Sequence, residues 1–149
     1  MKINKCIPAN QQLRATLSSL LAMAILLAAS PSMAENPAHL EKLKMTGKCA
    51  DCDLKGADLT GMKLQGVDLY RARLSGANLA GADLQGAYLR RTDLRGADIS
   101  NANLAGVELS DVYLQDANLE GANLTGANLE NSIFCETTMP DGTVNNDNC

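Results

Sequence analysis

The chain has 149 residues, enough for one domain, and aromatic residues make up only 3% of it, with no tryptophan and one phenylalanine. A core of large aromatic side chains is therefore excluded, and leucine and alanine must supply the apolar packing. Residues 1–34 contain three basic and no acidic residues, so the remainder has ten basic against 17 acidic residues. This net charge of about −7 argues against general binding to nucleic acid or anionic lipid.

Residues 1–34 are predicted to be a cleavable export signal. A basic leader precedes the apolar run Leu17–Ala29, which is shorter than the ~20 residues that a bilayer span needs. Ser32 and Ala34 are the small residues that a signal peptidase accepts, so cleavage is expected after Ala34. The alternatives are an N-terminal membrane anchor or a buried helix.

Export sets the expected location of the mature protein. We expect the periplasm or the medium, or the thylakoid lumen if the source is a thylakoid-bearing bacterium. After cleavage, no stable membrane span is expected.

Residues 35–51 are predicted to form an N-terminal cap with a short helix. Asn36 suits the N-cap, Pro37 suits the first helical turn, and Gly47 suits the C-terminal stop. Leucines of this helix can cover the first layer of the domain that follows, because an open stack of strands exposes unpaired edges.

From Cys52 to Glu136 the chain divides into 17 blocks of five residues. The third residue is leucine in fifteen blocks, the first is usually alanine, the second is most often Asp or Asn, and the fifth is glycine in ten. A strict period of five fits neither the 3.6-residue repeat of a helix nor the alternation of a long strand. It fits a very short strand followed by a corner. Residues one and three then point inward, residue two points outward, and glycine at position five permits a sharp bend or a positive φ.

This pattern resembles that of the pentapeptide-repeat proteins, whose consensus A(D/N)LXX is matched by residues 57–59, 77–79 and 122–124. The resemblance implies an all-β fold, a right-handed quadrilateral β-helix with four pentapeptides per coil. Residues 52–136 then make about four coils, and residues 137–149 form a C-terminal cap or tail.

The non-glycine corners support a coil of 20 residues. Glycine is missing from position five at Arg71, Arg91, Asp111 and Asn131, which are spaced by 20. Three further losses do not follow this spacing.

Four cysteines follow the predicted signal, and exported proteins usually oxidise such sets. Three pairings are open from the sequence alone. In the implied stack, Cys52 opens the first coil and Cys135 lies four coils away, beyond the ~7 Å between Cα atoms that a disulfide tolerates. The expected bonds are therefore Cys49–Cys52 and Cys135–Cys149. A c-type haem site, a thioredoxin-like redox pair and a zinc site are the alternatives for the CxxC spacing.

The sequence shows no catalytic constellation, so no enzyme activity, cofactor or metal site is predicted. His39, the only histidine, lies in the predicted cap. Asp58, Asn78, Asp98 and Asn118 recur at intervals of 20 and should stack along one outer face. Alternating amides with carboxylates would relieve repulsion between coils, and a calcium ladder is the alternative.

All arginines and tyrosines that follow residue 34 fall on two adjoining faces of the predicted coil. We name this set the arginine–tyrosine patch, a candidate binding surface: Tyr70, Arg71, Arg73, Tyr88, Arg90, Arg91, Arg95 and Tyr113. A cationic, aromatic patch on an acidic rod can bind an anionic partner. The alternative is a ladder of exposed salt bridges, such as Asp53–Arg73–Asp93, with no binding role.

The functional hypothesis is a non-enzymatic exported scaffold or protein-interaction module. Its partner would be a protein or an anionic surface component. The family resemblance also implies an alternative, a DNA mimic that binds DNA gyrase. The predicted signal opposes this alternative, since gyrase is cytoplasmic.

Overall fold

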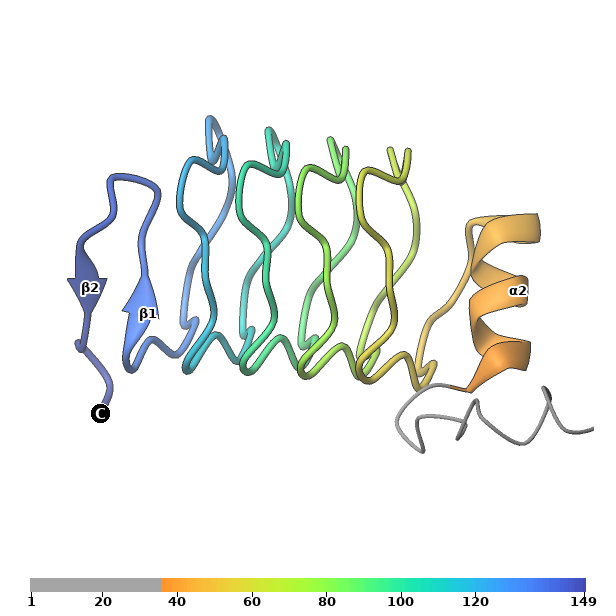
Figure 1. Cartoon of the computed structure of the whole chain (residues 1–149), viewed down its shortest axis with the longest axis horizontal. Helices are drawn as coiled ribbons and strands as arrows, with labels where there is room; N and C mark the ends of the chain where they lie inside the picture. The colour runs from red at the N-terminus through yellow and green to blue at the C-terminus, as the bar shows by residue number, and fades with distance from the viewer. Residues whose placement is uncertain (1–35) are drawn as a thin grey trace, which may run out of the picture. The chain divides into compact units, whose positions relative to one another are not determined.

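The computed structural model describes residues 36–149 (Figure 1). The predicted export signal and its cleavage site lie outside the described residues. Regular elements are few: helix α2 (Pro37–Thr46) and the two-residue strands β1 (Thr137–Thr138) and β2 (Val144–Asn145), which pair antiparallel. None of the helices within residues 36–149 has the length and apolar character needed to cross a membrane.

Between α2 and β1 the chain winds into a column of stacked coils (Figure 1). Fifteen isolated parallel bridges hold the coils together, and each joins a residue to the one 20 positions later, from Lys48–Asp68 to Asn118–Thr138. The 20-residue coil predicted from the corner positions is therefore confirmed. Residues of equal block position line up in columns that run along the axis.

The column exists because every block turns at its fifth residue. All 17 fifth positions of residues 52–136 have a positive φ, including the seven that are not glycine. The left-handed region costs an ordinary L-residue roughly 1–2 kcal/mol, which explains why glycine occupies most corners. The predicted role of position five is confirmed.

Leucine and alanine fill the interior as predicted. The inward residues from Leu54 to Leu119 are buried except Met62, which is partly buried, and Ile99, one of the two exceptions to leucine, is buried as well. Three buried first positions are polar, and each hydroxyl donates to a carbonyl of the preceding coil. Thr92 donates to Leu69 over 2.9 Å, Thr137 donates to Leu114 over 2.7 Å, and Ser132 donates to Leu109. These bonds satisfy the hydroxyls inside an otherwise apolar core.

Outward amides form ladders between coils. Asn103 Nδ2 donates to Asp83 Oδ1 over 2.9 Å, and Asn123 Nδ2 donates to Asn103 Oδ1 over 3.2 Å. Asn118 similarly donates to Asp98 over 3.4 Å. Each of these ladders starts at a carboxylate and continues with amides, so no two carboxylates meet.

Helix α2 lies at the N-terminal end of the column (Figure 1). The Asn36 side chain accepts the N–H of Ala38 over 3.1 Å, and Gly47, at φ 63°, ends the helix by donating to the Leu43 carbonyl. Leu43 is 1% exposed and belongs to the core of the column. The helix therefore begins and ends at the residues that the sequence predicted, Asn36 and Gly47.

The structure contains the two predicted disulfides. Cys49–Cys52 joins the end of the cap to the first coil, with 5.2 Å between Cα atoms. Cys135–Cys149 ties the C-terminal tail to the last coil, with 4.8 Å between Cα atoms. Each bond therefore fastens one end of the column.

The inward assignment makes a stability prediction for Leu84, which is 1% exposed. Leu84→Ala should lower the free energy of unfolding by about 2–5 kcal/mol, because it leaves a cavity between close-packed coils. Urea unfolding followed by circular dichroism measures the change. Met45→Ala is the control, since Met45 is 80% exposed and should leave the midpoint unchanged. Equal midpoints for both variants would contradict the packing described above.

Candidate functional site

A column of corner residues separates the arginine–tyrosine patch into two parts. Asp51, Arg71, Arg91, Asp111 and Asn131 are spaced by 20 and all adopt a positive φ. Arg71 and Arg91 are themselves members of the patch, and its other side chains come from the blocks on either side of this column. The two adjoining faces predicted from the sequence therefore meet at this column.

Each part of the patch lies at a hollow in the surface. The first hollow, of about 880 Å³, is lined by Tyr70, Tyr88 and Arg90 and reaches the end of α2 at Thr46. The second, of about 350 Å³, contains four members of the patch: Arg71, Arg73, Arg91 and Tyr113. Arg95 lines neither, but its guanidinium carbon lies 6.0 Å from the centre of the Tyr113 ring, within the range of a cation–π contact.

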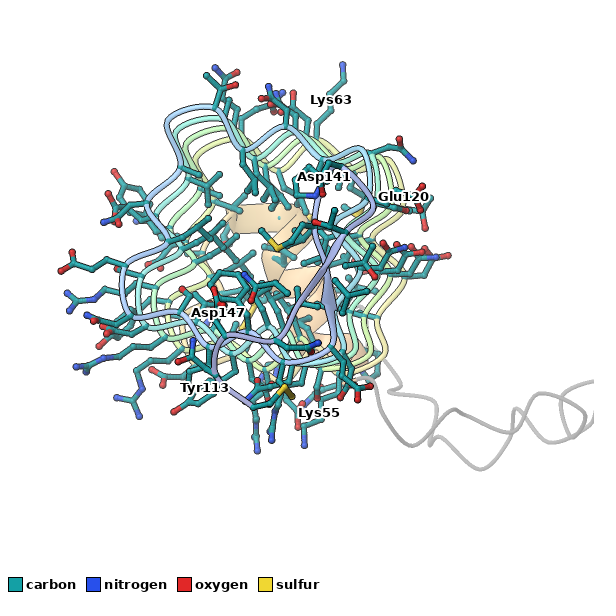
Figure 2. The ribbon with its side chains drawn as sticks, turned by 90° about the vertical axis from the view of Figure 1, so that its left-hand side faces the viewer. Lys55, Lys63, Tyr113, Glu120, Asp141 and Asp147 are labelled. Carbon is teal, nitrogen blue, oxygen red and sulfur yellow. A yellow bond between two sulfur atoms is a disulfide. The ribbon has the colours of Figure 1, made fainter. Side chains whose placement is uncertain are left out.

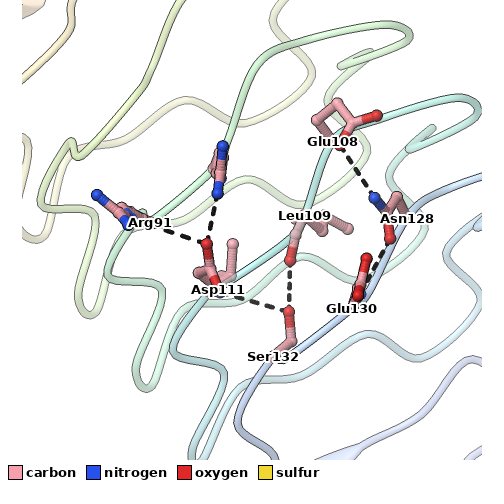
Figure 3. Close-up of polar contacts among 9 residues, drawn as sticks. Arg91, Glu108, Leu109, Asp111, Asn128, Glu130 and Ser132 are labelled. Atoms are coloured by element: carbon pink, nitrogen blue, oxygen red, sulfur yellow. Dashed lines mark hydrogen bonds and ion pairs between the residues drawn. The ribbon is translucent and has the colours of Figure 1, made fainter.

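Ion pairs tie the corner arginines to neighbouring coils. Arg71 Nε lies 3.1 Å from Asp51 Oδ1. Asp111 Oδ2 receives two arginines from the preceding coil: Arg90 Nε at 3.1 Å and Arg91 Nε at 3.7 Å (Figure 3). Because a single carboxylate faces two guanidinium groups, positive charge is in excess at this point.

The remaining arginines of the patch pair on the next face. Arg73 Nη2 lies 3.4 Å from Asp53 Oδ2 of the preceding coil. Arg95 makes a bidentate contact within its own coil, with Nη2 at 2.7 Å and Nε at 2.8 Å from the two oxygens of Asp93. These hydrogen bonds hold the pKa of the Asp93 carboxyl below its ordinary value of 3.8. The predicted ladder is therefore only half right: Asp53 pairs with Arg73, whereas Asp93 pairs with Arg95.

The pairing leaves the cationic groups accessible. The arginine side chains that form these pairs are 55–58% exposed, and Tyr88 and Tyr113 are 58% and 44% exposed. Exposed pairs of this kind contribute only about 0–1 kcal/mol each. A ligand oxyanion can therefore compete for the guanidinium groups at small cost to the fold.

Several residues of the first hollow lie outside the predicted patch. Lys48, Gln65, Asp68 and Glu108 also line it. Lys48 lies before the first block, so the five-residue frame did not reach it. The spacing of 20 between Lys48 and Asp68 could have placed Lys48 beside the patch, because the two residues form the first bridge of the column.

His39 has a structural contact. Its Nδ1 accepts the backbone N–H of Asp53 over 2.9 Å, and this bond links α2 to the first coil. The only histidine of the chain therefore takes part in the docking of α2.

Comparison with protein families gives one match. The model of pentapeptide repeats matches in eight copies, over residues 52–91, 72–111 and 113–141. Comparison with curated protein sequences gave no match.

Solved structures with the same repeat resemble the column. One is HetL, a pentapeptide-repeat protein involved in heterocyst differentiation regulation in the cyanobacterium Nostoc sp. strain PCC 7120. It has 36% identity and a TM-score of 0.59, over 66% of this chain and 48% of HetL. The chain thus spans about half the length of HetL.

A second structure is Rfr23 from the cyanobacterium Cyanothece 51142. It has 28% identity and a TM-score of 0.54, over 72% of this chain and 97% of Rfr23. The likeness to these proteins implies that the column is a right-handed quadrilateral β-helix.

The Asp93–Arg95 contact predicts a pH-dependent contribution to stability. The pKa of Asp93 is lower in the folded state, so its contribution is complete above the ordinary value of 3.8 and disappears as pH falls through the folded-state value. Asp93→Asn should therefore lower the free energy of unfolding at about pH 6 by roughly 1 kcal/mol or less. In urea titrations at decreasing pH, the wild-type and variant curves should converge. A difference that persists in acid would exclude this origin.

Because Arg91 adopts a positive φ, we expect this residue to lower the stability of the fold. Arg91→Gly should raise the free energy of unfolding by about 1 kcal/mol, because relief of the backbone strain exceeds the loss of one exposed ion pair. Thermal melting measures the change. Arg90→Gly is the comparison, since Arg90 does not have a positive φ and its replacement should not stabilise the protein. Stabilisation by both changes would point to charge rather than strain.

Proposed function

The chain belongs to the pentapeptide-repeat proteins, and we propose that it is a non-enzymatic exported scaffold that binds its partner through the arginine–tyrosine patch. The partner would be a protein or an anionic surface component. The expected export follows from the predicted signal at residues 1–34.

The observation that carries this proposal is the presence of arginine at two left-handed corners. Arg71 and Arg91 have φ values of 56° and 59° at positions where glycine is the common residue. Their strain amounts to roughly 1–2 kcal/mol each, whereas their exposed ion pairs return only about 0–1 kcal/mol. Strain that stability does not explain marks a functional position.

The chemistry of the patch favours an anionic partner group. Arginine presents a planar fork of donors that matches a carboxylate or a phosphate, and it stacks on aromatic faces. Tyr88 and Tyr113 supply exposed rings beside the guanidinium groups. A partner that offers carboxylates next to an apolar segment would use both kinds of side chain.

Two other readings of the fold receive less support. An enzyme would need a general base or a nucleophile, and His39 is engaged in the contact between α2 and the first coil. A DNA mimic that binds gyrase would need a continuous acidic surface, which the arginines of the patch interrupt. Fold alone does not assign a function, so the patch has to be tested directly.

The test is site-specific crosslinking in cells that express the full chain. A photoreactive amino acid replaces Tyr88, which is 58% exposed in the first hollow. Irradiation should give one dominant crosslinked product. The triple change Arg71→Glu, Arg90→Glu and Arg91→Glu should abolish it, because the patch then repels an anionic partner.

A matched control carries the same change in net charge outside the patch. Lys42→Glu, Lys44→Glu and Lys63→Glu alter three exposed side chains and should leave the crosslinked product intact. Equal loss in both triple variants would show a dependence on overall charge. Equal retention in both would show that the patch does not bind the partner.

A further inference from the structure

The two ends of the column differ in how completely they are covered. Helix α2 covers the N-terminal end with Leu43, which is buried in the core. At the C-terminal end, β2 crosses only part of the outline of the coils (Figure 2). Residues 122–131, which form two consecutive sides of the last coil, lie outside the β1–β2 pair. We call these ten residues the open edge.

Inward side chains of the open edge are less buried than those of the preceding coils. Leu104 and Leu109 are each 1% exposed, whereas Leu124 and Leu129, 20 residues later in the same columns, are only partly buried. Ala127 is also partly buried. Apolar surface is therefore accessible at the end of the core.

Backbone groups of the open edge lack the partners that their equivalents have. In the preceding coil, the N–H groups of Leu104 and Leu109 donate to the carbonyls of Asn123 and Asn128, both over 2.8 Å. Within residues 36–149, the N–H groups of Leu124, Gly126, Leu129 and Asn131 find no acceptor, and the carbonyls of Ala122 and Ala127 find no donor. These groups are set out as a template for one more strand.

Charge is distributed unevenly along the axis of the column, and this distribution indicates what kind of segment can bind the open edge. Residues 36–95 contain ten basic and seven acidic residues. No basic residue follows Arg95, whereas nine acidic residues do. Because sequence order follows the axis of the column, the C-terminal end is strongly acidic and the open edge lies within it.

A second copy of the chain fits this end poorly. Two C-terminal ends would bring like charges together. A head-to-tail arrangement would need a free N-terminal coil, and α2 covers that coil. The remaining occupant with complementary charge is a cationic segment of another protein.

We propose that the open edge binds a cationic, extended segment of a partner protein, which adds to residues 122–131 as a parallel strand. Backbone hydrogen bonds give the segment its register, and its apolar side chains cover Leu124 and Leu129. Its basic side chains point outward into the acidic field of the end. This surface is separate from the arginine–tyrosine patch, and the inference does not rest on the function proposed for that patch.

The probe is a labelled ten-residue peptide of two identical blocks, each with the order alanine, lysine, leucine, lysine, glycine. It matches the block pattern and the length of the open edge. Fluorescence anisotropy with protein purified from cells expressing the full chain should give saturable binding. Amide exchange at Leu124, Gly126, Leu129 and Asn131 should slow by about tenfold or more on binding, because these N–H groups then have acceptors.

Two control peptides separate strand addition from attraction between charges. The first has glutamate in place of lysine and should not bind. The second keeps lysine but is N-methylated at the second residue of each block, where the N–H would donate to Ala122 or Ala127. Its affinity should fall by about tenfold or more, since the backbone bonds are lost. Equal affinity for the methylated peptide would overturn the proposal.

Matched protein variants locate the binding site at one end. Glu130→Lys reverses an outward charge within the open edge, and Glu41→Lys makes the same change on α2; both side chains are exposed. Binding should weaken by about tenfold in the first variant and change little in the second. Equal weakening would overturn the proposal. The proposal would also be overturned if light scattering showed a dimer and the amides of the open edge were protected from exchange without peptide. A second copy of the chain would then occupy the open edge.

Discussion

The left-handed corner at every fifth residue is the constraint on which the rest of the structure depends. It ends each extended segment, so that a side of the coil carries a single bridged residue and side chains of the same block position return to the same side after 20 residues. Stacking of equal positions then gives an interior of leucine and alanine and an exterior of ladders. Without the corner, a chain of the same composition would not sort its leucine and alanine inward and its polar side chains outward.

Stacking in columns makes every outward residue a neighbour of the residues 20 positions before and after it. Between adjacent coils, at a separation of about 4.8 Å, like charges repel and opposite charges attract. The ladder of Asp83, Asn103 and Asn123 avoids repulsion by using one carboxylate and two amides. The corner column instead brings Arg71 and Arg91 together, at positions where the backbone is already strained. Contacts between residues 20 positions apart thus distinguish the ordinary surface, where like charges are kept apart, from the candidate site, where two arginines are stacked.

The fold was predictable because its repeat is written directly in the sequence, whereas the details of the site were not. Block positions predict burial, corners and stacking partners, as Leu84 and Gly86 show. They do not predict which rotamer a long side chain adopts. Asp93 has Arg73 and Arg95 within reach, and only the geometry selects Arg95. The open edge was also missed, because the sequence shows that the repeat stops without showing how much of the last coil the tail covers.

The 20-residue spacing also limits how the length of the chain can change in evolution. Removal or duplication of a whole coil keeps every later residue in its column. Loss of a single block, such as residues 77–81, would shift all later residues by one side. Arg91 would then lie above Gly66 instead of Arg71, and the members of the arginine–tyrosine patch after the lost block would no longer stack on those before it. Relatives that keep the patch are therefore expected to differ from this chain by multiples of 20 residues between its members.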